Sequence, residues 1–344
     1  MKAILFAAYG PPEGLKLVEL PEPEPGPTGV VVKVHAATVT AGDTEIRRLK
    51  LPLMLRLPLQ LYAGLFRPKR IRTLGMEFAG TVARVGDKVA AGGGPRGELQ
   101  VGDEIFGTTG FGFGAYAEYM RLSNDATVTQ KPRELSFADV APLPTGGNEA
   151  LFFVRTSRLQ AGEKILVYGA SGSIGTYLVQ LAAGIGADVT AVCGPETVDL
   201  MLELGATVAY PYTDPQKPWR RQKYDVFVDS AAKGGLFPSV SCVRRGGRYH
   251  RTNPGMGHLL GGLLVALFGG RRVSFASAKE SVEDLDYLKG LLVEGKLRTV
   301  LDKTFALEDM AAAHAHVDTG QKVGNVVIEV TGSERVSGTP ADGG

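Results

Sequence analysis

The feature that most constrains this 344-residue chain is a glycine-rich turn near its middle. A short apolar run, Lys164–Tyr168, leads into Gly169, Gly172 and Gly175, and a helical pattern follows at 176–184. In such a strand–turn–helix, backbone N–H groups at the helix start can bind a pyrophosphate, which side chains at the glycine positions would obstruct. The segment predicts a dinucleotide-binding site with four residues against the phosphates: Gly172, Ser173, Ile174 and Gly175.

Short strands and helices alternate on both sides of this turn. The strand candidates are 164–168, 188–193, 207–210, 225–228, 247–251 and 273–276. Six strands with intervening helices are typical of a doubly wound parallel sheet. A capping box at Ser136 and Asp139 predicts a helix through the 140s and 150s, and Ser281 with Asp284 predicts another.

The first third of the chain is rich in strand signals instead. Apolar runs at 2–7, 29–35 and 77–85 are separated by turn residues, while 46–70 is expected to be irregular or helical. A further strand is predicted at 325–330. Two segments lack any regular pattern, and we expect an exposed loop at 92–97 and a disordered tail at 332–344.

Composition excludes several classes of protein. A net charge of +2 gives no reason to expect nucleic acid as a partner, and two cysteines cannot form a disulfide framework. The most apolar stretch, Leu259–Phe268, is well short of the roughly 20 residues that span a bilayer. With no cleavable signal at the N-terminus, we expect a cytoplasmic protein without integral membrane association, in which this stretch lines a substrate mouth or a subunit contact. Peripheral membrane attachment through the same stretch is the alternative.

Four further motifs occur in a characteristic order. Gly75–Gly86 resembles a G-x-E-x-x-G-x-V stretch, Val101–Gly107 a V-G-D-x-V-x-G turn and Gly114–Tyr119 a G-x-Y-A-E-Y segment, and Tyr224–Asp229 looks like a fourth cofactor-domain strand. Together with the glycine turn, they make residues 1 to about 331 resemble the zinc-independent quinone oxidoreductase branch of the medium-chain dehydrogenase/reductase family.

The resemblance implies an α/β fold with two domains. A GroES-like, β-rich substrate domain would comprise residues 1–128 and 298–331, and a Rossmann dinucleotide-binding domain, a doubly wound parallel sheet, would comprise 129–297. It also implies a homodimer and a small-molecule substrate bound between the domains.

Zinc is not expected. The zinc-dependent branch has histidine where this chain has Met76, and the stretch Val39–Asp43 lacks the branch's ligand cysteine. The pair His314 and His316 has i, i+2 spacing, which places the two side chains on different faces of a helix. Fewer than the usual three protein ligands are therefore available for a catalytic zinc.

Without a Lewis acid, conjugated acceptors suit the site better than simple alcohols, because the charge left by hydride addition spreads into an enolate or hydroquinone. The resemblance accordingly implies an NAD(P)H-dependent quinone or enone reductase. Two alternatives within enzymes stay open: a zinc-free alcohol or aldehyde oxidoreductase, and a tailoring enoyl reductase. A third alternative is an NADPH-binding scaffold or sensor with little turnover.

Four residues are candidates for the reaction. Thr40 and Asp43 correspond to the family's asparagine and aspartate at the substrate site, and Arg47 faces either that site or the solvent. Glu149 takes the place of a threonine near the nicotinamide. Burial would make it a proton donor, whereas the alternative is a carboxylate that interacts only with a helix N-terminus.

The remaining candidates concern the cofactor. The strand at 188–193 ends without the acid that typically binds an NAD ribose, and Gly194 and Glu196 replace the family's serine and lysine. Tyr212 matches a tyrosine that contacts the adenosine ribose phosphate, so NADP(H) is preferred and NAD(H) stays possible. Further contacts with the cofactor are expected from Gly169, Gly194, Ala231, Thr252 and Asn325.

Overall fold

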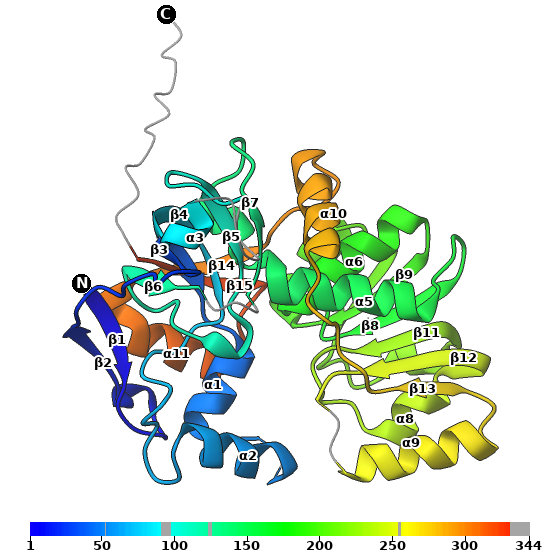
Figure 1. Ribbon diagram of the computed structural model, residues 1–344. Coiled ribbons are helices and arrows are strands. Elements are labelled where there is room, and N and C mark those ends of the chain that lie inside the picture. The colour runs from blue at the N-terminus through cyan, green and yellow to red at the C-terminus, as the bar shows by residue number, and fades with distance from the viewer. Residues whose placement is uncertain (52, 91–97, 123–125, 254–255, 331–344) are drawn as a thin grey trace, which may run out of the picture.

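The computed structural model describes residues 1–51, 53–90, 98–122, 126–253 and 256–330. The predictions for the loop at 92–97 and the tail at 332–344 lie outside this range. The described residues form two large sheets, each at the centre of its own lobe (Figure 1), and a small antiparallel pair, β1 (Lys2–Phe6) with β2 (Leu15–Glu19).

One lobe is built on a six-stranded sheet in which every pair of neighbours is parallel. Its strands are β8 (Lys164–Tyr168), β9 (Asp188–Cys193), β10 (Val208–Pro211), β11 (Tyr224–Asp229), β12 (Val243–Arg251) and β13 (Arg272–Ser274). The spatial order β10-β9-β8-β11-β12-β13 confirms the doubly wound sheet. The winding reverses between β8 and β11, and ligands in such sheets bind where this reversal meets the carboxyl ends of the strands.

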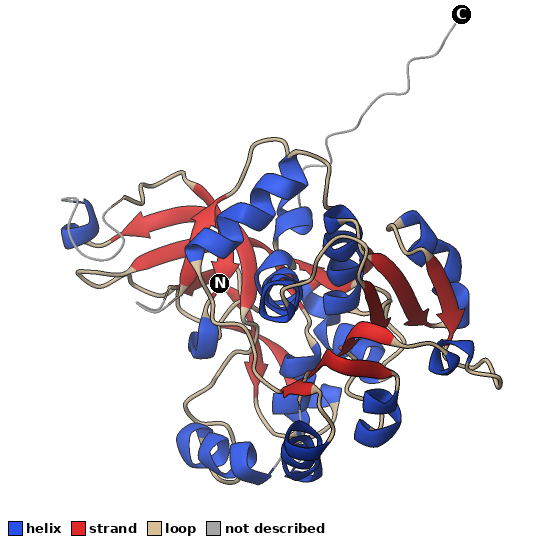
Figure 2. Cartoon of the chain, turned by 90° about the vertical axis from the view of Figure 1, so that its right-hand side faces the viewer, coloured by secondary structure: helices blue, strands red, loops and turns tan. Residues whose placement is uncertain are grey.

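Helices cover both faces of the parallel sheet (Figure 2). Along β8 the side chains alternate, so Ile165 and Val167 join one buried cluster and Leu166 joins another. The helices of this lobe are α5 (Asn148–Ser157), α6 (Ser173–Ile185), α7 (Val198–Glu203), α8 (Leu236–Ser241), α9 (Met256–Phe268) and α10 (Val282–Val293), whereas α4 (Phe137–Val140) lies against the other large sheet.

The other lobe is built on a seven-stranded mixed sheet. Its strands are β3 (Val30–Thr38), β4 (Glu77–Val85), β5 (Glu104–Thr108), β6 (Tyr119–Arg121), β7 (Thr127–Gln130), β14 (Leu301–Ala306) and β15 (Asn325–Glu329), with the helices α1 (Ala41–Arg48), α2 (Leu53–Ala63), α3 (Asp87–Ala90) and α11 (Met310–Asp318). The C-terminal strand β15 pairs with β3, so the chain returns to its first lobe (Figure 1). The domain boundaries at 128 and 298 stay predictions.

The helix expected through the 140s and 150s is not continuous. The capping box at Ser136 is present, but α4 ends at Val140, a π-helical segment (Leu143–Gly147) follows, and α5 begins at Asn148. Proline has no N–H to donate to an α-helical ladder, and residues 142 and 144 are both proline. A side chain at Gly146 would lie 2.5 Å from the Ser173 hydroxyl, so the glycines let this segment approach α6.

The strand predicted at 247–251 begins four residues earlier, at Val243. Tyr224 pairs with Val243 and Val226 with Arg248, so the register shifts between the two pairs. Gly246 has a φ of +77° within this irregularity. The charged residues there obscured the early start of the strand, because they lack the apolar pattern of the rest.

Candidate cofactor and active site

Glycine is present at the three positions of the turn for different structural reasons. Gly169 has a φ of +84°, and a Cβ there would lie 2.6 Å from that of Ala231. A Cβ at Gly175 would lie 2.4 Å from the carbonyl oxygen of Gly169. Contacts this short are excluded for a real side chain, so the first and third glycines are required by the turn and by the packing of α6 on β8.

Gly172 is different, because the protein itself does not require a glycine there. A Cβ at this position would meet only the Gly169 oxygen, at 3.5 Å, and the backbone φ is −78°. Gly172 is the N-cap of α6 and offers no capping side chain to the first-turn N–H groups. The open space and these donors fit a pyrophosphate, whose approach a side chain would obstruct.

The start of β15 lies directly against this turn. The Gly324 N–H donates to the Ser171 oxygen at 2.7 Å, and Gly172 and Gly324 form an isolated parallel bridge. The Ser173 hydroxyl donates to Asn325, whose side-chain amide donates to the Val300 oxygen at 3.1 Å. The structure therefore brings together Ser173 and Asn325, two predicted cofactor residues that lie 152 positions apart.

The carboxyl ends of β8, β11 and β12 meet beside Gly169. The Ser230 hydroxyl donates to the Tyr168 oxygen at 3.0 Å, and that of Thr252 donates to the Ser230 oxygen at 3.2 Å. Thr252 and Ala231, both predicted contacts of the cofactor, thus lie at the point where the winding of the sheet reverses.

An ion pair that sequence reasoning missed shapes the same edge. The Arg251 guanidinium lies 2.5 Å from the Asp229 carboxylate, and both side chains are buried. Arg251 also donates to the backbone oxygens of Ala232 and Gly234. The pair therefore holds the loop after β11, in which Ala232 has a positive φ of 53°. The sequence did contain a signal for this ion pair, because β11 ends with the acidic Asp229 and the neighbouring β12 ends with the basic Arg251.

Directly after the carboxyl ends of β9 and β10, Gly194 and Tyr212 lie close together. The Tyr212 N–H donates to the Cys193 oxygen at 2.8 Å, and the Tyr212 side chain is 52% exposed. Glu196 folds back over Gly194, since a Cβ on that glycine would lie 2.2 Å from the Glu196 carboxylate. A negative charge therefore lies where the adenosine ribose is expected.

Thr40 and Asp43 form the capping box at the start of α1. The Asp43 N–H donates to the Thr40 hydroxyl at 3.1 Å, and that hydroxyl donates to the Asp43 carboxylate at 2.6 Å. Asp43 is fully buried. Burial raises the pKa of Asp43, while the hydrogen bonds from Thr40 oppose that shift. Asp43 thus fixes the Thr40 side chain, which is only partly buried.

Glu149 lies in the first turn of α5 and against the segment that follows β13. The Ala278 N–H donates to its carboxylate at 3.2 Å, and the second carboxylate oxygen is buried. Burial raises the pKa of Glu149, with hydrogen bonds from Ala278 and Ser277 opposing the shift. Its carboxylate is therefore not simply a solvated group at a helix N-terminus.

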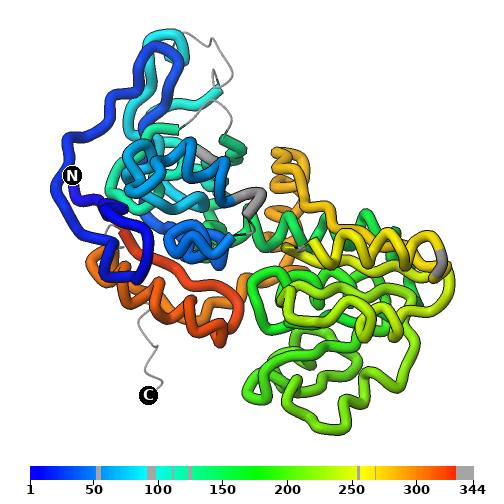
Figure 3. Tube along the Cα trace, turned by 90° about the horizontal axis from the view of Figure 1, so that it is seen from below, coloured from blue at the N-terminus to red at the C-terminus, as the bar shows by residue number. Residues whose placement is uncertain are grey.

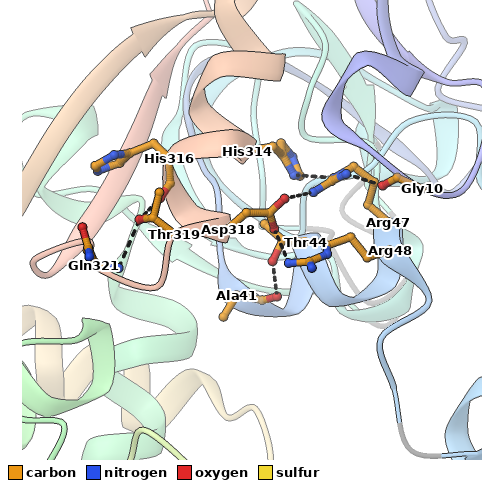
Figure 4. A network of polar contacts seen from close by, with 10 residues as sticks. All are labelled: Gly10, Ala41, Thr44, Arg47, Arg48, His314, His316, Asp318, Thr319 and Gln321. Carbon is orange, nitrogen blue, oxygen red and sulfur yellow. Dashed lines mark hydrogen bonds and ion pairs between the residues drawn. The ribbon is translucent and has the colours of Figure 1, made fainter.

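The two orientations considered for Arg47, toward the substrate site or the solvent, are both wrong. Its side chain is fully buried and bridges α1 and α11 (Figure 4). It donates to His314 at 3.3 Å, to the Gly10 oxygen, and to Asp318, with which it forms an ion pair. Arg47 thus anchors α1, the helix that Thr40 caps, rather than contacting a substrate.

Glu77 is a second residue that sequence reasoning did not select, although it lies in the family's glycine–glutamate motif. It is buried at the contact between the lobes and accepts hydrogen bonds from the Thr38 hydroxyl and from the Thr145 N–H, the latter at 2.7 Å. Burial raises the pKa of Glu77 to about 7, and burial lowers that of Lys322 to about 8. Asp43 contributes a further, smaller rise at Glu77.

Replacing Glu77 with glutamine is expected to flatten the pH dependence of stability. The folded state holds this proton more tightly than the unfolded chain, so the stabilisation is complete below pH 4.5 and is lost as pH rises through 7. At about 1.4 kcal/mol per pKa unit, the wild type loses about 3 kcal/mol relative to Glu77→Gln. Urea unfolding at pH 5 and pH 8 measures this difference. The exposed Glu134→Gln is the control, and an equal pH response in all three proteins would contradict the prediction.

No group of three or more His, Cys, Asp or Glu side chains in the described part of the chain is arranged to hold a metal ion. His314 packs edge-on against Tyr116, and His316 bonds to Asp302 at 2.5 Å. These two side chains therefore have separate partners, as their spacing predicted.

Comparison with known families agrees with this architecture. Residues 26–133 match the family described as alcohol dehydrogenase GroES-like domain, and residues 204–328 match the family described as zinc-binding dehydrogenase. A quinone-oxidoreductase, QR1, from Triphysaria versicolor is 30% identical over 96% of this chain and 98% of its own. The chain belongs to the quinone oxidoreductase-like branch of the medium-chain dehydrogenase/reductase superfamily. It is an oxidoreductase with a GroES-like and a Rossmann-like part.

Other members of the superfamily cover the chain to the same extent. A quinone oxidoreductase from Pseudomonas aeruginosa is 29% identical over 95% of this chain and 99% of its own. An NADPH-dependent alkenal/one oxidoreductase from Arabidopsis thaliana is 28% identical over 95% of this chain and 79% of its own.

Solved structures show the same fold. The quinone oxidoreductase from Coxiella burnetii superposes with a TM-score of 0.83 at 28% identity, over 96% of this chain and 99% of its own. The Escherichia coli quinone oxidoreductase, solved in complex with NADPH, has a TM-score of 0.80 at 22% identity, over 96% of this chain and 100% of its own.

Proposed function

We propose that this oxidoreductase is zinc-independent and uses NADPH to reduce a quinone or an α,β-unsaturated carbonyl compound. The observation that carries the proposal is the open space at Gly172, at the start of α6 and beside the reversal of the parallel sheet. The names of the relatives that reduce quinones and alkenals support the class of acceptor.

The residues present suit a dinucleotide along the carboxyl edge of the parallel sheet. The N–H groups of Ser173, Ile174 and Gly175 would bind the pyrophosphate. Gly194 and Tyr212 would lie at the adenosine end. The remaining cofactor residues, Gly169, Ala231, Thr252 and Asn325, would support the other half.

NADPH supplies a hydride when it is bound, and the side chains of the chain supply position and a proton. We assign to Thr40 a hydrogen bond that orients the substrate or the nicotinamide ribose, with Asp43 holding its hydroxyl. Glu149 is the proposed proton donor, because its raised pKa keeps the carboxyl protonated at a higher pH than that of an ordinary glutamate.

Zinc-independence rests on the residues at the ligand positions. Met76 follows Gly75 where a zinc-dependent relative has histidine, and the thioether of methionine is not among the usual ligands of zinc. Its terminal methyl group lies 3.6 Å from the position of a Cβ on Gly42, so it packs against the start of α1.

Replacing Glu196 with glutamine is expected to lower the KM for NADPH about fivefold and to leave that for NADH nearly unchanged. The Glu196 carboxylate over Gly194 repels a ribose 2′-phosphate, and one exposed charge pair at about 4 Å is worth roughly 1 kcal/mol in water. Initial rates with both nucleotides measure the ratio. The exposed Asp199→Asn in α7 is the matched control. A lower KM for NADH in Glu196→Gln would contradict this placement of the ribose.

Two further proposals concern the oligomeric state of the protein and its location in the cell. We propose a homodimer, which light scattering on the purified protein measures. We also propose a cytoplasmic location, because the two cysteines, Cys193 and Cys242, are buried free thiols, as is usual in a reducing compartment.

Turnover tests the function. Purified protein is mixed with NADPH and, in turn, 1,4-benzoquinone, 9,10-phenanthrenequinone, an alkenal and a cyclic enone, with and without a zinc chelator. We expect oxidation of NADPH with a quinone or an enone, at a rate that the chelator does not change. NADPH binding with no turnover of any acceptor would instead favour a scaffold or sensor, and loss of activity with chelator would overturn zinc-independence.

A further inference from the structure

Helix α9 exposes an almost continuous leucine face. Leu260, Leu263, Leu264 and Leu267 are between 53% and 66% exposed. The opposite side of the helix is small and packed: a Cβ on Gly261 would meet Leu236, and one on Gly262 would meet Phe275. The helix therefore turns its glycines inward and its large side chains outward, the reverse of a helix that serves the core of its own lobe.

Helix α2 and the turn after it expose a second apolar surface on the other lobe. Leu61 is 74% exposed, Tyr62 54% and Phe66 86%. Both helices lie at the same end of the molecule, at the bottom of Figure 1, and both are near the viewer in Figure 3. Clusters of exposed apolar side chains, such as the one on each of these helices, mark a binding site, whereas single exposed leucines do not.

The charged residues that flank the two helices in the sequence have one sign. The sequence has no Asp or Glu between Glu45 and Glu77, nor between Asp229 and Glu280. The basic residues next to the apolar side chains are Arg56, Arg67, Lys69, Arg70 and Arg72 near α2, and Arg245, Arg271 and Arg272 near α9. The Arg70 guanidinium lies 5.5 Å from the centre of the Tyr62 ring, so charge and aromatic surface are adjacent.

We propose that the exposed faces of α2 and α9 form one surface that binds the plane of an anionic lipid bilayer. Leucines and aromatic side chains would enter the boundary between headgroups and acyl chains, while the arginines and lysines beside them contact lipid phosphates. A second copy of this chain is the less suitable occupant, because two surfaces that both lack acidic residues would repel each other.

The attachment is peripheral. No helix in the described ranges has the length and apolar character needed to cross a membrane. The apolar area and the basic residues would act together, so binding is expected to depend both on anionic lipid and on salt concentration. This proposal of membrane binding does not depend on which substrate the enzyme reduces.

Vesicle sedimentation of the full chain tests this surface. We expect binding to vesicles of equal parts phosphatidylglycerol and phosphatidylcholine, weaker binding to phosphatidylcholine alone, and release at high salt. The double variants Leu260→Asp/Leu264→Asp and Leu61→Asp/Phe66→Asp should each bind at least tenfold more weakly. Leu202→Asp in α7, a side chain that is 44% exposed, should bind as the wild type does.

Charge variants separate the electrostatic contribution to membrane binding from the apolar contribution. Arg67→Gln, Lys69→Gln and Arg70→Gln should each weaken binding to the anionic vesicles about fivefold, with little effect on binding to phosphatidylcholine. Wild-type protein that ignores anionic vesicles at low salt would overturn the proposal. So would a protein whose α9 variant changes only from dimer to monomer in light scattering, because that face would then be a subunit contact.

Discussion

Replacing Gly172 with alanine is expected to weaken NADPH binding at least tenfold while the unfolding free energy stays within about 0.5 kcal/mol of the wild type. The protein tolerates the new methyl group, because its nearest neighbour is the Gly169 oxygen at 3.5 Å and the backbone conformation is ordinary. The methyl group would instead occupy the space that the pyrophosphate needs. Fluorescence titration gives the affinity, and urea unfolding gives the stability.

Two other glycines of the same turn and helix serve as matched controls. Gly184→Ala, also in α6, meets nothing within 4 Å and should bind NADPH as the wild type does. Gly175→Ala should lose stability, because its Cβ would lie 2.4 Å from the Gly169 oxygen. Equal affinities for Gly172→Ala and the wild type would show that the phosphates do not lie at this turn.

Replacing Asp229 with asparagine is expected to cost about 3 to 5 kcal/mol of unfolding free energy, the usual cost of removing one partner from a buried ion pair. Arg251 is 6% exposed in its side chain and would keep its charge without a counterion. Because Arg251 also holds the backbone oxygens of Ala232 and Gly234, the loop beside Gly169 should loosen. Urea unfolding measures the stability, and the KM for NADPH should rise with its loss.

The double variant Asp229→Asn/Arg251→Met identifies the cause. Removing the unpaired charge should restore at least half of the lost free energy, since the desolvated guanidinium is then absent. A double variant as unstable as the sum of the two single variants would mean that the pair acts through packing, and not through its charges.

The sequence predicted the parallel-sheet lobe in detail, because its signals are local. The runs at 164–168 and 188–193 coincide with β8 and β9, and the glycines at 169 and 172 lie between β8 and α6, whose first turn contains Gly175. Each of these features can be recognised from a few neighbouring residues in the sequence. The same holds for the helix caps at Ser136 and Ser281.

The errors concern contacts between residues far apart in the sequence. Arg47 meets Asp318, 271 positions away, and no periodicity near residue 47 could show that α11 covers it. Glu77 meets Thr145 across the two lobes, so its burial depends on how the lobes pack and not on its own strand. The discontinuity at Leu143–Gly147 has a local cause in the prolines at 142 and 144, and the close packing of Gly146 on α6 adds a contact between residues far apart in the sequence.

Hydride transfer from a labelled cofactor tests the central claim most directly. Chelator-treated protein is loaded with NADPH carrying two deuterium atoms at C4 of the nicotinamide and is then mixed with a cyclic enone or a quinone. We expect the saturated ketone to gain one deuterium at its β-carbon, or the quinone to be reduced with a deuterium isotope effect on the rate. Failure of the protein to bind either NADPH or NADH would contradict the account, because the turn at Gly169–Gly175 would then be only a structural turn.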